Sequence, residues 1–109
     1  MRIRKNKYGA KRVQFDGHNF HSIAEANRYA KLLLLQNKGV IDRLELQPKY
    51  DIRINGEKIC SYSADFKYLD RVTMNYVVED VKGVLTPVYK LKKKLVKALY
   101  GIDIVEVRA

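Results

Sequence analysis

The chain is short, strongly basic and moderately apolar. Its 109 residues suffice for one domain with a single core, but not for a catalytic domain beside a separate recognition domain. The 22 Lys and Arg residues against 12 Asp and Glu residues give a net charge of +10, which favours nucleic acid as the partner. The longest apolar run, residues 32–35, is far too short to span a bilayer, so no membrane partner is expected.

The chain begins with a basic segment that lacks the features of a signal peptide. Residues 1–12 contain no apolar stretch of the roughly 7–15 residues that such a peptide needs, so a cytoplasmic location is expected. Cys60 is the only cysteine, and with only two histidines beside it no disulfide and no zinc pattern is present. Any metal ion is therefore expected to be held by carboxylates.

Basic residues are concentrated in an N-terminal arm over residues 1–12 and in one segment near the C-terminus. We expect both groups to contact nucleic-acid phosphates without reading bases. The expected nucleic-acid contacts are Arg2, Arg4, Lys5, Lys7, Lys11, Arg12, Lys90, Lys92, Lys93, Lys94 and Lys97.

Residues 13–109 are expected to form one domain that begins with a hairpin and a helix. The alternating segment VQFDGHNF turns at Asp16-Gly17, a dipeptide typical of tight hairpins. Ser22 is a favourable helix N-cap, and apolar side chains then recur at helical spacing until Gly39. This pattern predicts a helix over residues 22–37.

Strands follow this helix. Alternating apolar and polar side chains predict four of them, at residues 41–46, 50–54, 59–69 and 76–81. Pro48 interrupts the chain between the first two, and Asn55-Gly56 predicts a turn after the second. These strands are expected to be mostly antiparallel.

A second helix and a last strand close the chain. Thr86 is the expected N-cap of this helix, and Pro87 lies in its first turn. Apolar spacing predicts a buried stripe made of Val88, Leu91, Leu95, Ala98 and Leu99. The segment IDIVEV then predicts a strand, so the expected architecture is α+β, in the order helix, several mostly antiparallel strands, helix, strand.

The segment VVEDVKG contains the charged residues that bear most on function. Side chains alternate along a strand, so Asp80 and Lys82 share one face and Glu79 points to the other. Antiparallel pairing with the preceding strand makes it possible for Asp65 to lie beside Asp80. Two adjacent carboxylates repel each other unless a cation lies between them, and oxygen ligands suit Mg²⁺ or Mn²⁺. Lys82 would then orient the attacking water or neutralise a phosphate.

Each of these residues also has a plainer structural interpretation. A lone Asp in a strand is more often an edge residue or part of a salt bridge. Glu25 completes a Ser-x-x-Glu capping box, which accounts for it without catalysis. A catalytically silent, basic nucleic-acid-binding module therefore stays open as an alternative.

Taken together, the motifs resemble a known nuclease signature. Asp65 is followed, after fourteen intervening residues, by Asp80-Val81-Lys82. This spacing resembles the PD-(D/E)XK signature, with Ala64 where that superfamily often has proline. The blocks FHSIAEANRY, LELQPKY, ADFKYLD and VVEDVKG are together similar to a small family of phage and prophage proteins assigned to this superfamily.

The resemblance implies a restriction-endonuclease-like fold with core order α-β-β-β-α-β and a mixed central sheet flanked by helices. It implies a metal-dependent endonuclease using Mg²⁺, or Mn²⁺, with Asp65, Asp80, the Val81 carbonyl and Glu25 as ligands, Lys82 as the catalytic lysine and Gln47 as a possible lining residue. It further implies a homodimer that resolves Holliday junctions or other branched DNA during phage recombination or replication in a bacterial host cell. A nicking, flap or repair-type nuclease of the same fold is the alternative within the superfamily.

Overall fold

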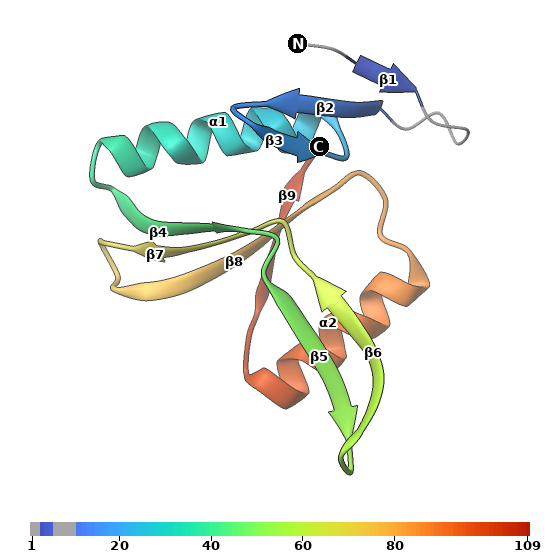
Figure 1. Ribbon diagram of the computed structural model, residues 1–109. Helices are drawn as coiled ribbons and strands as arrows, with labels where there is room; N and C mark the ends of the chain where they lie inside the picture. The colour runs from blue at the N-terminus through green and yellow to red at the C-terminus, as the bar shows by residue number, and fades with distance from the viewer. Residues whose placement is uncertain (1–2, 6–10) are drawn as a thin grey trace.

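The computed structural model describes residues 3–5 and 11–109, and their side chains from Arg12 onward. Figure 1 shows two helices packed on opposite sides of a mixed sheet, with two strand ribbons attached. The elements are β1 (Ile3–Lys5), β2 (Lys11–Phe15), β3 (His18–Phe20), α1 (Ile23–Asn37), β4 (Ile41–Leu46), β5 (Lys49–Ile54), β6 (Glu57–Ser63), β7 (Phe66–Asp70), β8 (Asn75–Lys82), α2 (Pro87–Tyr100) and β9 (Ile104–Arg108).

Both helices begin at the predicted caps. The Ser22 hydroxyl accepts a hydrogen bond from the Glu25 amide at 3.1 Å, and the Thr86 hydroxyl accepts one from the Tyr89 amide at 3.1 Å. Gly101 ends α2 with a φ of 70°, a left-handed conformation that glycine adopts without steric cost. Within the described part of the chain, neither helix is long and apolar enough to cross a membrane.

The predicted hairpin is present, and part of the expected arm belongs to its sheet. Asp16 and Gly17 both have positive φ, 52° and 77°, as a tight turn between β2 and β3 requires. Strand β1 pairs antiparallel with β2, so residues 3–5 and 11–12 lie in strands. The rest of the expected arm, including Arg2 and Lys7, lies outside the described residues. For Arg4, Lys5 and Lys11 only the backbone is placed.

The central sheet has the strand order β4-β7-β8-β9, with β8 and β9 parallel and the other pairs antiparallel. Together with the helices, its strands follow the chain order α1, β4, β7, β8, α2, β9. This is the order α-β-β-β-α-β that the resemblance implies, with the β5–β6 hairpin inserted. The mixed α+β class is thereby confirmed. Helix α1 covers one face of the sheet, and the core between them contains Leu32, Phe66 and Tyr68. Helix α2 covers the other face, and the core there contains Val78 and Val96.

The prediction of one strand over residues 59–69 is wrong in one respect, because this stretch bends and divides into β6 and β7. The pairing register continues through the bend, from Leu46 opposite Phe66 to Lys49 opposite Ser63. Only β7 continues into the central sheet, while β5 and β6 swing away as a separate ribbon (Figure 1). Pro48, which has no amide hydrogen, lies at this bend and prevents a regular ladder there.

The predicted buried stripe of α2 is also wrong. Leu95 is half-buried, but the other four members, Val88, Leu91, Ala98 and Leu99, are exposed. Helix α2 instead turns Tyr89 and Val96 toward the sheet. It carries two apolar arcs, and periodicity alone could not show which of them faces the core.

Candidate active site

The bend in the β4–β5 and β6–β7 ribbon places Gln47 and Asp65 side by side. The Gln47 amide donates to the Asp65 carbonyl at 2.9 Å, and the Asp65 amide donates to the Glu79 carbonyl at 3.0 Å. Since Phe66 pairs with Glu79 in the β7–β8 ladder, the next step of the register sets Asp65 opposite Asp80. The adjacency that the sequence left possible is therefore present in the fold.

Asp80 and Lys82 share one face of β8, as alternation predicts. The Lys82 Nζ lies 3.3 Å from Asp80 Oδ2, and the Tyr62 hydroxyl donates a short hydrogen bond to the same oxygen. Asp80 is only 3% exposed, so its bond with Tyr62 lies in a nearly water-free environment, whereas the Lys82 side chain is 26% exposed. Burial and the hydrogen bond to Asp80 raise the pKa of Tyr62, which keeps its hydroxyl protonated as a donor.

Glu79 points to the opposite face, also as predicted. The Arg28 guanidinium from α1 holds its carboxylate with two bonds, from Nε at 2.8 Å and Nη2 at 2.6 Å, and the Tyr68 hydroxyl donates a third. Glu79 is 1% exposed. Its carboxylate thus serves the packing between α1 and the sheet, on the face away from Asp80.

Asp65 is the residue with the largest electrostatic perturbation among these carboxylates. Burial, a hydrogen bond with Asp80 and the nearby charges of Glu25 and Asp80 raise the pKa of Asp65 to about 8. The Val81 amide donates to Asp65 Oδ2 at 2.7 Å and opposes this rise. Near neutral pH and without a cation, Asp65 therefore holds a proton that an isolated Asp would release.

Glu25 lies at the start of α1, and the structure satisfies only half of its predicted capping role. The Glu25 amide bonds to Ser22. Its buried side chain lines the same pocket as Asp65, and its carboxylate lies 3.9 Å from the His21 Nδ1. In the part of the chain that the structure describes, the Glu25 side chain makes no hydrogen bond back to Ser22. The capping box therefore accounts for the Glu25 amide but not for its carboxylate, whose described partner is His21.

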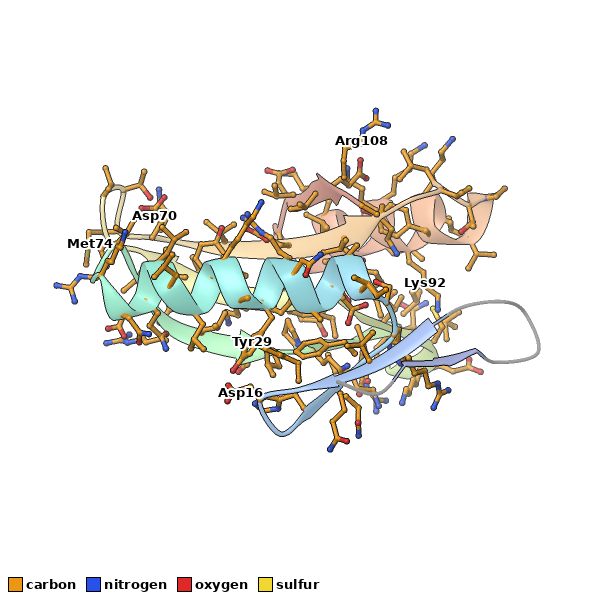
Figure 2. The ribbon with its side chains drawn as sticks, turned by 90° about the horizontal axis from the view of Figure 1, so that it is seen from above. Asp16, Tyr29, Asp70, Met74, Lys92 and Arg108 are labelled. Atoms are coloured by element: carbon orange, nitrogen blue, oxygen red, sulfur yellow. The ribbon has the colours of Figure 1, made fainter. Side chains whose placement is uncertain are left out.

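Glu25 and Asp65 line a pocket of about 290 Å³ beneath the β2–β3 hairpin. The other lining residues are Gly17, His18, Asn19, Phe20, Leu46 and Gln47. The hairpin is fixed to α1 by the Tyr29 hydroxyl, which donates to Asp16 at 2.7 Å; Figure 2 shows Tyr29 on the side of α1 that faces the turn at Asp16. Gln47 has the positive φ of 53°, an uncommon conformation for this residue type, which marks the bend as locally strained.

The donor set fits a hard divalent cation, although the side chains are held by other contacts. Over residues 12–109, no three His, Cys, Asp or Glu side chains are arranged as a metal-holding group. Asp80 contacts Tyr62 and Lys82. Asp65 accepts a hydrogen bond from the Val81 amide, whereas the expected metal ligand at Val81 was its carbonyl. The donors are all oxygen, and the charge conflict between Asp65 and Asp80 is one that a cation would relieve.

Two tyrosines that the sequence interpretation missed support the charged pair. Tyr62 contacts Asp80, and the Tyr89 ring lies under Lys82, whose Nζ is 4.2 Å from the ring centroid. The Tyr89 hydroxyl in turn donates to Glu106 at 2.8 Å. Tyr62 stands only three residues before Asp65, and strand alternation sets it on the same face as Ala64. This nearness in the sequence was the available signal. Tyr89 has no comparable local signal, because its position depends on how α2 is rotated.

A family model described as "Protein of unknown function (DUF1064)" matches residues 5–106. The chain belongs to the DUF1064 family. No curated protein and no solved structure matches the chain. The matched span includes Glu25, Gln47, Asp65 and Asp80, so the whole candidate site lies inside the DUF1064 segment.

The basic residues of this DUF1064 chain differ in how much they are engaged by the protein itself. Lys92 donates to the Ser61 carbonyl at 3.0 Å, Lys93 pairs with Glu106 and Lys97 pairs with Asp103. The other expected DNA contacts whose side chains are described, Arg12, Lys90 and Lys94, are exposed. Surface ion pairs contribute little free energy, so DNA phosphates can still compete for Lys93 and Lys97.

We expect the stability of the metal-free protein to fall as pH rises from about 5 to 8. The folded-state pKa of Asp65, about 8, lies above its ordinary value of 3.8, so the folded state keeps a proton that the unfolded state has released. Thermal unfolding in EDTA measures this slope, and Asp65→Asn should flatten it. Added Mg²⁺ should raise the melting temperature more at pH 8 than at pH 6, because a metal ligand must be deprotonated. An equal pH dependence of the melting temperature in the wild type and Asp65→Asn would contradict the raised pKa of Asp65.

Proposed function

We propose that this protein is a metal-dependent DNA endonuclease that hydrolyses phosphodiester bonds in branched DNA. The observation that carries the proposal is the meeting of Asp65, in the bend before β7, with Asp80 of β8; Lys82 lies 3.3 Å from Asp80, and Glu25 lines the adjoining pocket. The resemblance to the PD-(D/E)XK signature supports the same function. The net charge of +10 supports DNA as the substrate.

Each site residue has a role in this chemistry. Glu25, Asp65 and Asp80 would hold Mg²⁺ or Mn²⁺, which when bound supplies a Lewis acid and lowers the pKa of water. Lys82 carries the positive charge that offsets the charge developing on the phosphate, and its amine orients the attacking water. Tyr62 holds the Asp80 carboxylate in place through its hydrogen bond.

The surrounding surface supports binding that does not depend on base sequence. Exposed Lys90 and Lys94 of α2 and exposed Arg12 of β2 can contact phosphates on either side of the cleaved bond. Such contacts favour recognition by DNA shape. A single site cuts a single strand, so symmetric cutting of a four-way junction, as in phage recombination, would require a homodimer.

Purified protein should cut a four-way junction faster than flap, nicked or linear duplex DNA in Mg²⁺, and EDTA should abolish cutting. The measurement is a time course on end-labelled substrates of each kind, with the same strands annealed in different combinations as the control. Preferential cutting of the flap or the nicked duplex would instead support the nicking or flap-type alternative. Absence of cutting on all four substrates, in both Mg²⁺ and Mn²⁺, would contradict the endonuclease proposal.

A catalytically silent nucleic-acid-binding module is the second candidate. The observation that favours it is that Asp80 already has two partners, Tyr62 and Lys82, and therefore needs no cation to be stable in its buried position. This candidate predicts salt-dependent DNA binding that is indifferent to Mg²⁺. Titration of labelled DNA with the protein, with and without Mg²⁺, distinguishes it from a site that holds metal.

A further inference from the structure

We infer that the pocket beneath the β2–β3 hairpin receives one nucleotide of the substrate whose base is out of its pair, so that cleavage is directed to sites, such as branch points, where a base is unpaired or readily extruded. This inference rests on the proposed endonuclease function and specifies its substrate. The pocket adjoins the candidate site through Glu25 and Asp65, and its far wall is the hairpin. A strand whose phosphate approaches the two carboxylates would therefore place a neighbouring nucleotide against that wall.

The size of the pocket favours a single nucleotide. Its volume of about 290 Å³ is at the lower end of the roughly 300–1,000 Å³ that small-molecule pockets span. That is room for one nucleotide, whereas a stacked base pair brings a second base and a second strand. Continuous duplex would have to unpair before a base could enter.

The lining has the mixed character that a nucleobase requires. His18, Asn19 and Gln47 present side-chain donors and acceptors that can bond to base edges. Leu46, which is half-buried, supplies apolar surface for a face of the ring. The two carboxylates at the opposite side would repel a bare phosphate, so the base and sugar, rather than the phosphate, suit the hairpin side.

The β2–β3 hairpin, which forms one wall of the pocket, is packed against the core, so the pocket is present without a ligand. Val13 and Phe20 are fully buried in the core that α1 also contributes to. The His18 ring packs edge-on against Tyr29, with centroids 5.5 Å apart, and Tyr29 also bonds to Asp16. His18 and Asn19 are exposed residues held on this rigid support, so they can contact a ligand without reorganising the fold.

The inference is tested with two duplexes of identical sequence, one fully paired and one with a single unpaired 2-aminopurine nucleotide. In Mg²⁺ the unpaired substrate should be cut about 10- to 100-fold faster, because it avoids the cost of extruding a paired base. In Ca²⁺, without cleavage, binding should change the 2-aminopurine fluorescence as the base leaves solvent and enters the pocket. Asn19→Ala and His18→Ala should each reduce both effects, and Gln14→Ala, an exposed hairpin residue outside the pocket lining, should leave both unchanged.

The possible failures are distinguishable. Equal cutting of the two duplexes by the wild type would overturn the inference and leave the endonuclease function standing. A fluorescence signal in Ca²⁺ that is the same in the wild type, Asn19→Ala and His18→Ala would also overturn it. Absence of cutting on any DNA would overturn the proposed function, and the fluorescence change would still test whether the pocket takes a nucleotide.

Discussion

Asp80→Ala is expected to abolish Mg²⁺-dependent cleavage while leaving DNA binding in Ca²⁺ close to that of the wild type. Asp80 faces Asp65, contacts Lys82 and is 3% exposed, so its loss removes a proposed carboxylate ligand and the partner of the lysine together. A metal ion contributes several kcal/mol of transition-state stabilisation, so the cleavage rate should fall by about a thousandfold or more. Cleavage time courses and a fluorescence-anisotropy titration with labelled DNA measure the two quantities.

Asp51→Ala is the control, because Asp51 is also a strand aspartate but is only half-buried and lies on the β5–β6 ribbon, where it pairs with Lys58 and Arg53. Its cleavage rate should equal that of the wild type. Circular dichroism must show that Asp80→Ala is folded. Identical trace cleavage by the wild type and the Asp80 variant would attribute that activity to a contaminant and favour the silent DNA-binding module.

Arg28→Met is expected to destabilise the fold by about 3–5 kcal/mol, because it removes the cationic partner of a buried carboxylate. Arg28 is bonded to Glu79 through Nε and Nη2, and this hydrogen bonding raises the pKa of the guanidinium. Without the guanidinium, the Glu79 carboxylate, which is 1% exposed, keeps the neutral Tyr68 hydroxyl as its side-chain donor. Urea unfolding should show a lower midpoint with an unchanged dependence on urea concentration.

Arg53→Met is the control for this prediction, since Arg53 is exposed and lies 4.0 Å from Asp51 at the surface. Its effect should stay within about 0.5 kcal/mol. Adding Glu79→Gln to Arg28→Met should restore part of the lost stability, because the unpaired buried charge is then gone. Equal unfolding midpoints for Arg28→Met and the wild type would show that Glu79 is stable without its ion pair.

The sequence by itself determined the features that depend on neighbouring residues. Ser22 and Thr86 set the starts of the helices because a cap bonds to an amide three residues on. Asp16-Gly17 and Asn55-Gly56 set the turns because their backbones accept positive φ. Alternation on one strand likewise separated Asp80 from Glu79 correctly, since it needs no knowledge of any other strand.

The tertiary structure alone decided how these pieces meet. The bend opposite Pro48 sets Asp65 against Asp80, and no local pattern specifies a register between two strands. The rotation of α2 depends on which of its two apolar arcs fits the sheet, and that choice brought Tyr89 under Lys82. The pocket walled by His18 joins a hairpin, a helix start and a strand bend from three parts of the chain. Packing between distant segments fixes all three features, whereas short-range periodicity reports only the conformation of each segment.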